Sequence, residues 1–187
     1  MDRLLVVAAT ERELAVGGEW PRILCGMGPV EAAAATAAAI ARHSPGLILH
    51  VGIAGARRQA GLPPPALVIG TESRYCDLAV PEDWAPRVVM PPRRLLDAAA
   101  RALPHAVQCA IGTSARVGGT TGCDVEAMEG FGVLRAAQLA GVPAIEVRAI
   151  SNEIEEQDRG RWRFDDAFAA VVQATPHLVW ELASCVN

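Results

Sequence analysis

Short apolar runs alternate with alanine-rich segments of helical period along the 187-residue chain. A short apolar run bounded by polar or turn residues predicts a buried strand, whereas apolar positions that recur with the period of a helix predict a helix. We therefore expect strands over Arg3–Ala8, Arg22–Cys25, Leu47–Val51, Ala66–Thr71, Val107–Gly112 and Ala144–Ile150. We expect helices over Pro29–Arg42, Arg93–Leu103 and Val125–Ala140, and a terminal helix over Phe164–Ala174 that continues after Pro176.

Strands that alternate with helices predict an α/β domain with a largely parallel sheet. The strand over Leu47–Val51 ends in Gly52-Ile53-Ala54-Gly55, and between later elements we expect an excursion over Tyr75–Pro92 and a flexible loop over Gly118–Gly122. A chain of 187 residues and 19.7 kDa is the usual size of one hydrophobic core. We therefore expect residues 1–187 to form a single domain.

The composition favours a small-molecule ligand. With a net charge of -4 and 4% aromatic residues, the chain lacks the basic surface and the stacking platform that nucleic acids require. All 17 basic residues are arginine, which excludes Schiff-base chemistry on lysine. The five cysteines include no C-x-x-C, and the histidines have no metal-ligand spacing, so we expect no disulfide framework and no metal. Without a signal peptide or membrane span, we expect a cytoplasmic protein with no membrane partner.

Polar segments that follow apolar runs are the first candidates for a site, because open α/β sheets bind ligands beyond the carboxyl ends of their strands. Four such segments stand out, namely Thr10–Glu13, Gly52–Gly55, Met128-Glu129 and Arg148–Asn152. Each also has a purely structural interpretation. Glu129 would complement a helix dipole, the glycines would permit a tight turn, and the acidic residues of the first segment would be solvated.

The motifs Gly52-Ile53-Ala54-Gly55, Met128-Glu129-Gly130 and Arg148-Ala149-Ile150-Ser151-Asn152, in this order, resemble the nucleoside phosphorylase and nucleosidase superfamily. This superfamily includes methylthioadenosine/S-adenosylhomocysteine nucleosidase. Together with Asp158-Arg159-x-x-Trp162, the motifs are most similar to those of the futalosine hydrolases, nucleosidases of an alternative menaquinone pathway. The resemblance implies a three-layer sandwich, in which helices flank a twisted, mostly parallel central sheet. It also implies a cofactor-free enzyme that hydrolyses the N-ribosidic bond of a purine nucleoside, and a homo-oligomer.

The resemblance assigns a task to each of three residues. Glu129 matches the glutamate that accepts hydrogen bonds from both ribose hydroxyls, a task that suits a carboxylate. Glu13 matches the base that orients and deprotonates the attacking water, with Glu11 as the alternative if the register is shifted. Asn152 would face the purine. Further site contacts are expected from Met128, Gly52, Ala54, Gly55, Arg148, Ser151, Val117 and Trp162. Of these, Arg148 is expected to support Glu129 or the loop near the base rather than to bind phosphate.

Asn152 bears on the identity of the base. Adenine-cleaving relatives carry an aspartate here, which can protonate N7 of the purine. An asparagine cannot act as a general acid, but its amide NH2 can donate to N7 and O6 of a 6-oxopurine. This favours hypoxanthine, and hence futalosine, over adenine, unless Asn152 only caps the end of the strand.

Two further differences concern the nucleophile and the base. The phosphorylases place an arginine two residues before Gly52, where this chain has His50, and Glu31 would repel a phosphate at the helix that begins at Pro29. Water is therefore the expected nucleophile. Phosphorolysis, with Arg57 or Arg58 approaching from the next loop, stays an alternative, as do adenine release and a non-catalytic nucleoside-binding homologue. Thr113–Val117 carries no aromatic residue to stack on the base, and the stretch from Gly119 to Val125 is shorter than in relatives.

Overall fold

A computed structural model describes residues 3–15, 17–81, 83–118 and 122–186. Over these residues the strands are β1 (Leu4–Ala8), β2 (Arg22–Leu24), β3 (Leu47–Ala56), β4 (Leu67–Tyr75), β5 (Val88–Val89), β6 (Val107–Thr113), β7 (Val125–Ala127) and β8 (Ala144–Glu153). The α-helices are α1 (Pro29–His43), α2 (Arg93–Ala102), α3 (Gly130–Leu139) and α4 (Phe164–Ala183), with short 3-10 turns at Arg58–Ala60 and Arg159–Arg161. The predicted α/β class is confirmed.

The strands form one mixed sheet. The parallel pairs are β1 with β2, β1 with β3, β3 with β8, β4 with β6, and β6 with β7. The antiparallel pairs are β3 with β7, β4 with β5, and β4 with β8. Strands β3, β7, β6, β4 and β8 thus pair in a closed circuit, and β1 and β2 extend the sheet beyond β3. The circuit brings the far ends of β3, β7 and β8 side by side.

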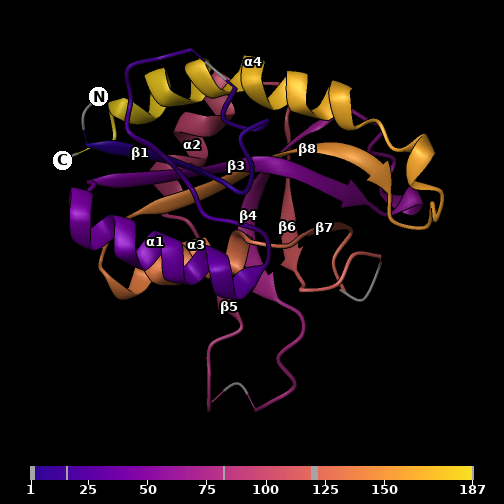
Figure 1. Cartoon of the computed structure of the whole chain (residues 1–187), viewed down its shortest axis with the longest axis horizontal. Coiled ribbons are helices and arrows are strands. Elements are labelled where there is room, and N and C mark those ends of the chain that lie inside the picture. The colour runs from indigo at the N-terminus through magenta and orange to yellow at the C-terminus, as the bar shows by residue number, and fades with distance from the viewer. Residues whose placement is uncertain (1–2, 16, 82, 119–121, 187) are drawn as a thin grey trace.

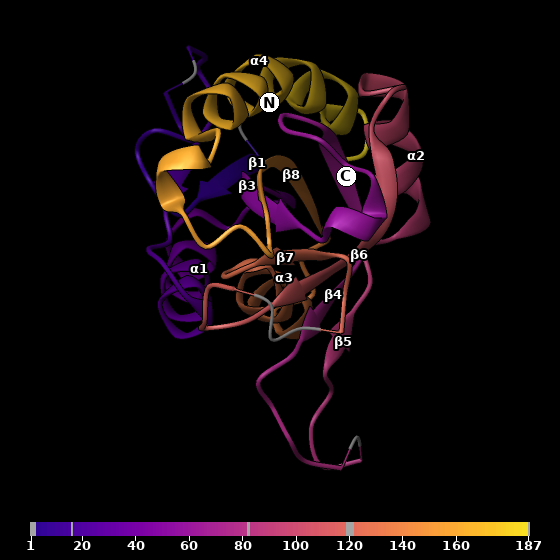
Figure 2. The same ribbon diagram turned by 90° about the vertical axis from the view of Figure 1, so that its right-hand side faces the viewer.

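Helices cover both faces of the sheet (Figures 1 and 2). Helices α2 and α4 pack together on one face, and α1 and α3 pack together on the other. Strand β1 contributes side chains to the hydrophobic cores on both faces of the sheet, because successive side chains of a strand point to opposite faces. Leu4 and Val6 join the core beneath α4, whereas Leu5 and Val7 join the core beneath α1 and α3. All four side chains are fully buried.

The helix predicted over Val125–Ala140 begins five residues later than expected, at Gly130. Residues 125–127 instead form strand β7, which pairs with β6 on one side and with the end of β3 on the other. Val125 and Ala127 alternate with Glu126, so this stretch fits both periods. Pairing with two strands decides between them, because tertiary context overrides a weak local preference.

The predicted end of the third strand at Val51 is also wrong, because β3 runs on through Gly52–Gly55 to Ala56. The alternative that the glycines only permit a tight turn therefore does not hold. Two neighbouring strands hold the glycines in an extended conformation, with β8 along the whole segment and β7 at its end. Strand β8 likewise continues past Ile150 to Glu153, with a bulge opposite Ala54 and Gly55. These two extensions carry five of the predicted site residues, Gly52, Ala54, Gly55, Ser151 and Asn152.

The predicted excursion over Tyr75–Pro92 extends away from the sheet below the rest of the molecule in Figures 1 and 2. It contains the end of β4 and the short strand β5. Of the predicted flexible loop over Gly118–Gly122, residues 119–121 lie outside the described residues. Within the described part of the chain, no helix is long and apolar enough to cross a membrane.

Candidate active site

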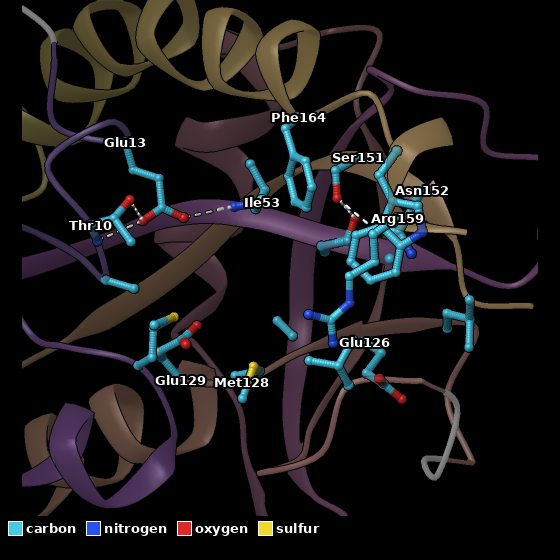
Figure 3. Close-up of a pocket in the computed structure, with 18 of the residues that line it drawn as sticks. Thr10, Glu13, Ile53, Glu126, Met128, Glu129, Ser151, Asn152, Arg159 and Phe164 are labelled. Carbon is cyan, nitrogen blue, oxygen red and sulfur yellow. Dashed lines mark hydrogen bonds between the residues drawn. The ribbon is translucent and has the colours of Figure 1, made fainter. Parts of the chain in front are cut away.

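A cavity of about 300 Å³ opens where the ends of β3 and β8 meet the loop after β1. Figure 3 shows Glu13 and Glu129 at one end of this cavity, and Asn152, Arg159 and Glu126 at the other. Most of the site residues predicted from the sequence line it, namely Glu13, Ala54, Gly55, Val117, Met128, Glu129, Ser151, Asn152 and Trp162. The fold thus collects residues that are far apart in the sequence around one space.

Glu13 lies in the loop after β1 and is almost completely buried. One carboxylate oxygen accepts from the backbone N–H of Thr10 at 2.8 Å and from its hydroxyl at 2.9 Å. The other accepts from the backbone N–H of Ile53 at 3.2 Å. Burial raises the pKa of Glu13, against the opposing charge of Arg148 and these hydrogen bonds. Glu11, the alternative candidate, is exposed and does not line the cavity.

Glu129 stands at the junction between β7 and α3, as the residue before the helix. Its side chain is 5% exposed. One carboxylate oxygen accepts from the backbone N–H of Gly28, at the start of α1, at 3.2 Å. The other lies 3.3 Å from the guanidinium of Arg148. The carboxylate is therefore fixed by a helix N-terminus and a buried cation while its side chain still borders the cavity.

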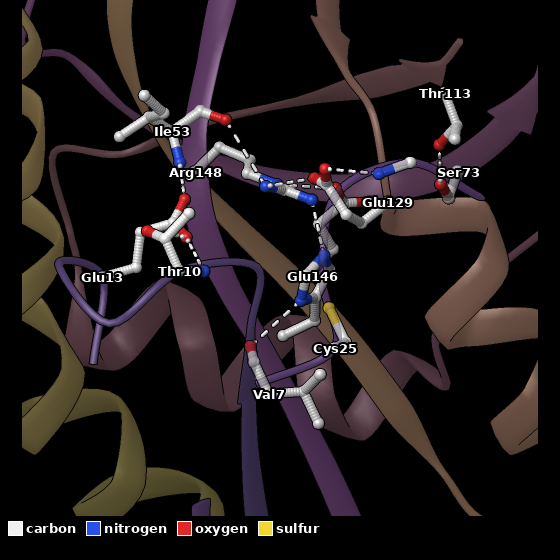
Figure 4. Close-up of polar contacts among 12 residues, drawn as sticks. Val7, Thr10, Glu13, Cys25, Ile53, Ser73, Thr113, Glu129, Glu146 and Arg148 are labelled. Atoms are coloured by element: carbon white, nitrogen blue, oxygen red, sulfur yellow. Dashed lines mark hydrogen bonds and ion pairs between the residues drawn. The ribbon is translucent and has the colours of Figure 1, made fainter. Parts of the chain in front are cut away.

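Arg148 is fully buried and does not line the cavity. Figure 4 shows its polar contacts. Its Nε donates to Glu146 at 2.8 Å, and its Nη1 contacts Glu129 and the carbonyl oxygen of Ile53. Its Nη2 makes a short contact with Nε2 of His50. Arg148 thus contacts Glu129, the support that the sequence leads us to expect, but it does not line the cavity, where a substrate contact is also expected. Its hydrogen-bonding groups are instead directed to protein partners, because a buried guanidinium needs them.

His50 is held in one tautomer by these contacts. Its Nδ1 lies 3.0 Å from the carbonyl oxygen of Val7, so Nδ1 carries the proton and donates. Nε2 must then accept from Arg148. Burial and the charge of Arg148 lower the pKa of His50 well below its ordinary value. His50 is thus a neutral acceptor for the arginine.

Gly52 and Gly130 make room for this network. A Cβ at Gly52 would collide with Nη1 of Arg148, and a Cβ at Gly130 would collide with the carboxylate of Glu146. Gly52 was predicted to contact the substrate, but it does not line the cavity. Both glycines are required where they stand because charged side chains pass directly over them.

Asn152 has an amide whose orientation is set by its neighbours. Its Nδ2 donates to the carbonyl oxygen of Glu153 at 3.0 Å, and its Oδ1 accepts from the hydroxyl of Ser151 at 2.7 Å. An amide nitrogen carries two hydrogens, so Asn152 retains donor capacity beyond the bond to Glu153. The side chain is 8% exposed and borders the cavity.

Aromatic side chains reach the cavity from a region where we assigned only Trp162 to the site. Trp162 and Phe164 have ring centroids 5.4 Å apart, and Phe164 and Phe168 have centroids 6.4 Å apart. All three line the cavity. The four-residue spacing of Phe164 and Phe168, which places both rings on one face of a helix, was the signal that the sequence offered. Thr10, Ile53 and Arg159 also line the cavity, and they lie in the candidate segments and motifs without a role having been assigned to them. Glu126 lines it too and lies outside those segments.

Comparison with known proteins shows the family to which the chain belongs. Residues 17–121, more than half of the chain, match the model of the phosphorylase superfamily. The structure is similar to a methylthioadenosine/S-adenosylhomocysteine nucleosidase from Colwellia psychrerythraea 34H, with a TM-score of 0.85 at 19% identity over 96% of this chain and 95% of that one. The chain therefore belongs to the phosphorylase superfamily, as its motifs predicted.

Within the family, the chain is 34% identical over 194 residues to the futalosine hydrolase of Streptomyces coelicolor, across 88% of this chain and 80% of the relative. It also has the fold of a mutant futalosine hydrolase of Helicobacter pylori strain 26695, with a TM-score of 0.85 at 15% identity over 97% of this chain and all of that one. The resemblance to this branch of the family is confirmed. The protein is an enzyme of the N-glycosyl hydrolase class.

Proposed function

We propose that the protein hydrolyses the N-ribosidic bond of a 6-oxopurine nucleoside, and that this nucleoside is futalosine. The observation that carries the proposal is the meeting of Glu13, Glu129 and Asn152 around one cavity. The identity of the substrate is supported by the similarity to a futalosine hydrolase. The products would then be hypoxanthine and dehypoxanthine futalosine, an intermediate of menaquinone biosynthesis.

Glu129 holds the sugar. Cleavage of a glycosidic bond passes through a sugar with oxocarbenium character, so a carboxylate beside the ring stabilises the developing positive charge. The hydrogen bond from Gly28 and the ion pair with Arg148 fix this carboxylate before substrate arrives. Glu129 accepts from the ribose 2′ and 3′ hydroxyls, and Met128 packs against the sugar.

Glu13 activates the nucleophile. It takes a proton from a water molecule whose oxygen forms the new bond to C1′, while the bond between C1′ and the purine nitrogen N9 breaks. The electron pair of that bond leaves with the base. A carboxylate with a raised pKa is a stronger base than an ordinary one, so the burial of Glu13 supports this role.

Asn152 eases departure of the base. The amide hydrogen that is not bonded to Glu153 donates a shared hydrogen bond to N7 and O6 of the purine, which carry the negative charge as the bond breaks. The base is then protonated from solvent, because an amide cannot supply a proton. The bonds from Ser151 and to Glu153 support this orientation, with the nitrogen as donor.

Three observations favour water over phosphate. A phosphate site needs converging arginines or free N–H groups at a helix N-terminus. At the start of α1, Gly28 already donates to Glu129. His50, where phosphorylases have arginine, is a neutral acceptor for Arg148. Arg57 and Arg58 donate to the carbonyl of Cys123 and the carboxylate of Glu153, outside the cavity.

The test measures, by chromatography, the purine released from futalosine, inosine and methylthioadenosine. Each substrate is assayed with and without phosphate. We expect hypoxanthine from futalosine without phosphate, and its loss in Glu129→Gln. A strict requirement for phosphate would make the protein a phosphorylase, and release of adenine alone would contradict the role of Asn152. Binding without turnover of any substrate would indicate a nucleoside-binding homologue.

A further inference from the structure

A further buried carboxylate belongs to the network beside the cavity, and the proposed mechanism gives it no task. Glu146 lies on strand β8 and is fully buried. Its neighbours Ile145 and Val147 point into the core beneath α4, so Glu146 and Arg148 point to the opposite face of the sheet. Glu146 therefore stands on the same side of the strand as the arginine that pairs with Glu129.

The burial of Glu146 is unfavourable for stability. One carboxylate oxygen, Oε1, accepts from Nε of Arg148 at 2.8 Å, whereas Oε2 has no hydrogen-bond partner among the described residues. A Cβ at Gly130, the first residue of α3, would collide with Oε2, so a glycine is needed there to make room for the carboxylate. A buried oxygen without a hydrogen bond costs free energy, and apolar side chains often replace a buried ion pair without loss of stability. The arrangement thus points to a task other than stability.

Arg148 makes contacts through all three nitrogens of its guanidinium. Nε donates to Glu146, and Nη2 contacts His50 (Figure 4). Nη1 lies 3.3 Å from Glu129 and 3.4 Å from the carbonyl oxygen of Ile53. A guanidinium is planar and rigid, so the direction of its Nε–H bond fixes where Nη1 and Nη2 point. Because Glu146 is the partner of Nε, it determines the direction in which Nη1 faces.

Nη1 of Arg148 lies near both carboxylates of the proposed mechanism. A Cβ at Gly52 would collide with Nη1 and would lie 2.9 Å from Oε1 of Glu13, so both atoms pass over this glycine. Nη1 also forms the ion pair with Glu129. A turned guanidinium would remove this ion pair and, of its bonds to the described residues, leave Glu129 only the one from Gly28. The direction of Arg148 therefore decides how firmly the carboxylate of Glu129 is held beside the cavity.

We propose that Glu146 is a positioning residue for ribose binding, which holds the guanidinium of Arg148 so that Nη1 meets Glu129. This inference rests on the proposed function for the place of the ribose beside Glu129, and it adds a residue that does not touch the substrate. The acceptor oxygen of Glu146 carries the role, so a neutral side chain that keeps this oxygen keeps the role. Loss of the acceptor should weaken recognition of the ribose hydroxyls and leave recognition of the base unchanged.

The variants Glu146→Met and Glu146→Gln separate the acceptor from the charge. Methionine has a similar length but no strong acceptor for Nε of Arg148, whereas the amide oxygen of glutamine can still accept from it. The readout is the ratio of kcat/KM for inosine over 2′-deoxyinosine, which reports the contact between Glu129 and the 2′ hydroxyl. We expect Glu146→Met to lower this ratio by about tenfold, because the site then no longer favours a substrate that carries the hydroxyl. Glu146→Gln should restore most of the ratio.

Val147→Ala is the matched control for a loss of packing. Val147 is the next residue on β8, is also buried, and faces the core on the other side of the sheet. This variant should lower the free energy of unfolding and leave the ratio unchanged. An unchanged ratio in Glu146→Met, or an equal fall in Glu146→Gln, would overturn the inference. If Glu146→Met does not fold, Glu146→Asp, which withdraws the carboxylate from Nε by one methylene, takes its place.

Binding of C-nucleosides tests the inference independently of turnover. In formycin B the base is joined to the ribose through carbon, so this ligand cannot be hydrolysed. Titration calorimetry should show that Glu146→Met loses about tenfold of the preference for formycin B over its 2′-deoxy form, while the Kd for free hypoxanthine changes little. A preference that does not change contradicts the inference even if the protein hydrolyses futalosine. A preference that falls in a protein that releases no purine supports it while the proposed function fails.

Discussion

The two ends of the cavity are built differently. At the sugar end, Glu129 forms an ion pair with the fully buried Arg148, which also contacts Glu146 and His50. Glu13 is held by Thr10 and Ile53 and lies in the field of the same arginine. At the base end, Asn152 on β8 and Glu126 on β7 lie on opposite sides of β3, while Trp162 is half-buried and Arg159 is exposed. The carboxylates at the end assigned to bond cleavage are held by a buried network of hydrogen bonds and ion pairs. The end assigned to base selection is bordered by more exposed segments.

This difference separates two requirements of one enzyme. Bond cleavage needs carboxylates held close to their working positions before the substrate binds, and a buried network provides this. Base selection needs only a few donors and acceptors in the correct order across the sheet. Substitutions at the sugar end should therefore damage turnover or folding, whereas those at the base end should redirect specificity.

The largest effect is expected from Glu13→Gln. The amide keeps the size of the side chain but cannot take a proton from water, so kcat should fall by about 10² to 10⁴-fold. Binding of hypoxanthine should change little, which equilibrium titration would show. Glu11→Gln is the control in the same loop, because Glu11 is exposed and outside the cavity. An equal loss in both variants would contradict the assignment of the base to Glu13.

Arg148→Met should act mainly on stability. Methionine fills much of the space but leaves the buried carboxylates of Glu146 and Glu129 without their cation, which costs about 3–5 kcal/mol of unfolding free energy. Urea denaturation followed by circular dichroism measures this. Arg93→Met, which removes an exposed i,i+4 ion pair with Asp97, should cost less than about 1 kcal/mol. Similar costs for the two variants would show that the buried network is not what supports the sugar end.

The residues that line the cavity could be predicted from the sequence better than the buried network around Arg148. Motifs located Glu13, Glu129 and Asn152, since each follows or begins an apolar element. The motif that contains Asn152 also placed Arg148 at the site as a support for Glu129 or the loop near the base, but nothing in the sequence shows that His50 and Glu146 converge on it. That convergence depends on strand register.

The errors in the fold have a similar cause. Val125–Ala127 and Gly52–Gly55 were assigned by local period and by the turn preference of glycine. Pairing with neighbours distant in sequence makes both segments strands. Glu126 was missed for this reason, because a helix over Val125–Ala140 would not have aligned it with Asn152.

At the base end, Asn152→Asp should alter specificity more than stability. An aspartate can carry the proton that N7 of adenine takes up and can accept from the 6-amino group. We expect the ratio of kcat/KM for adenosine over inosine to rise by about tenfold to a hundredfold, with the midpoint of thermal unfolding nearly unchanged. Parallel purine-release assays measure the ratio. A ratio that does not change would remove Asn152 from base selection.

The smallest effect concerns pH. Because Glu13 must be deprotonated to act, kcat/KM should fall as the pH drops through its pKa, which burial raises above 4.5. The hydrogen bonds from Thr10 favour the charged form of Glu13, so Thr10→Val should raise the pH at which kcat/KM falls. If that pH does not change, a group other than Glu13 controls the loss of activity at low pH. The pH dependence of the initial rate of hypoxanthine release measures both curves.

The most direct test of the account is the origin of the new oxygen at C1′. Futalosine is incubated with the enzyme in water enriched in ¹⁸O and with inorganic phosphate present, and the sugar product is analysed promptly by mass spectrometry alongside an exchange control of unlabelled product. We predict one ¹⁸O in the sugar and no sugar phosphate, with hypoxanthine as the released base. A sugar 1-phosphate without solvent ¹⁸O at the bond to C1′ would contradict the central claim that Glu13 directs water to the ribose.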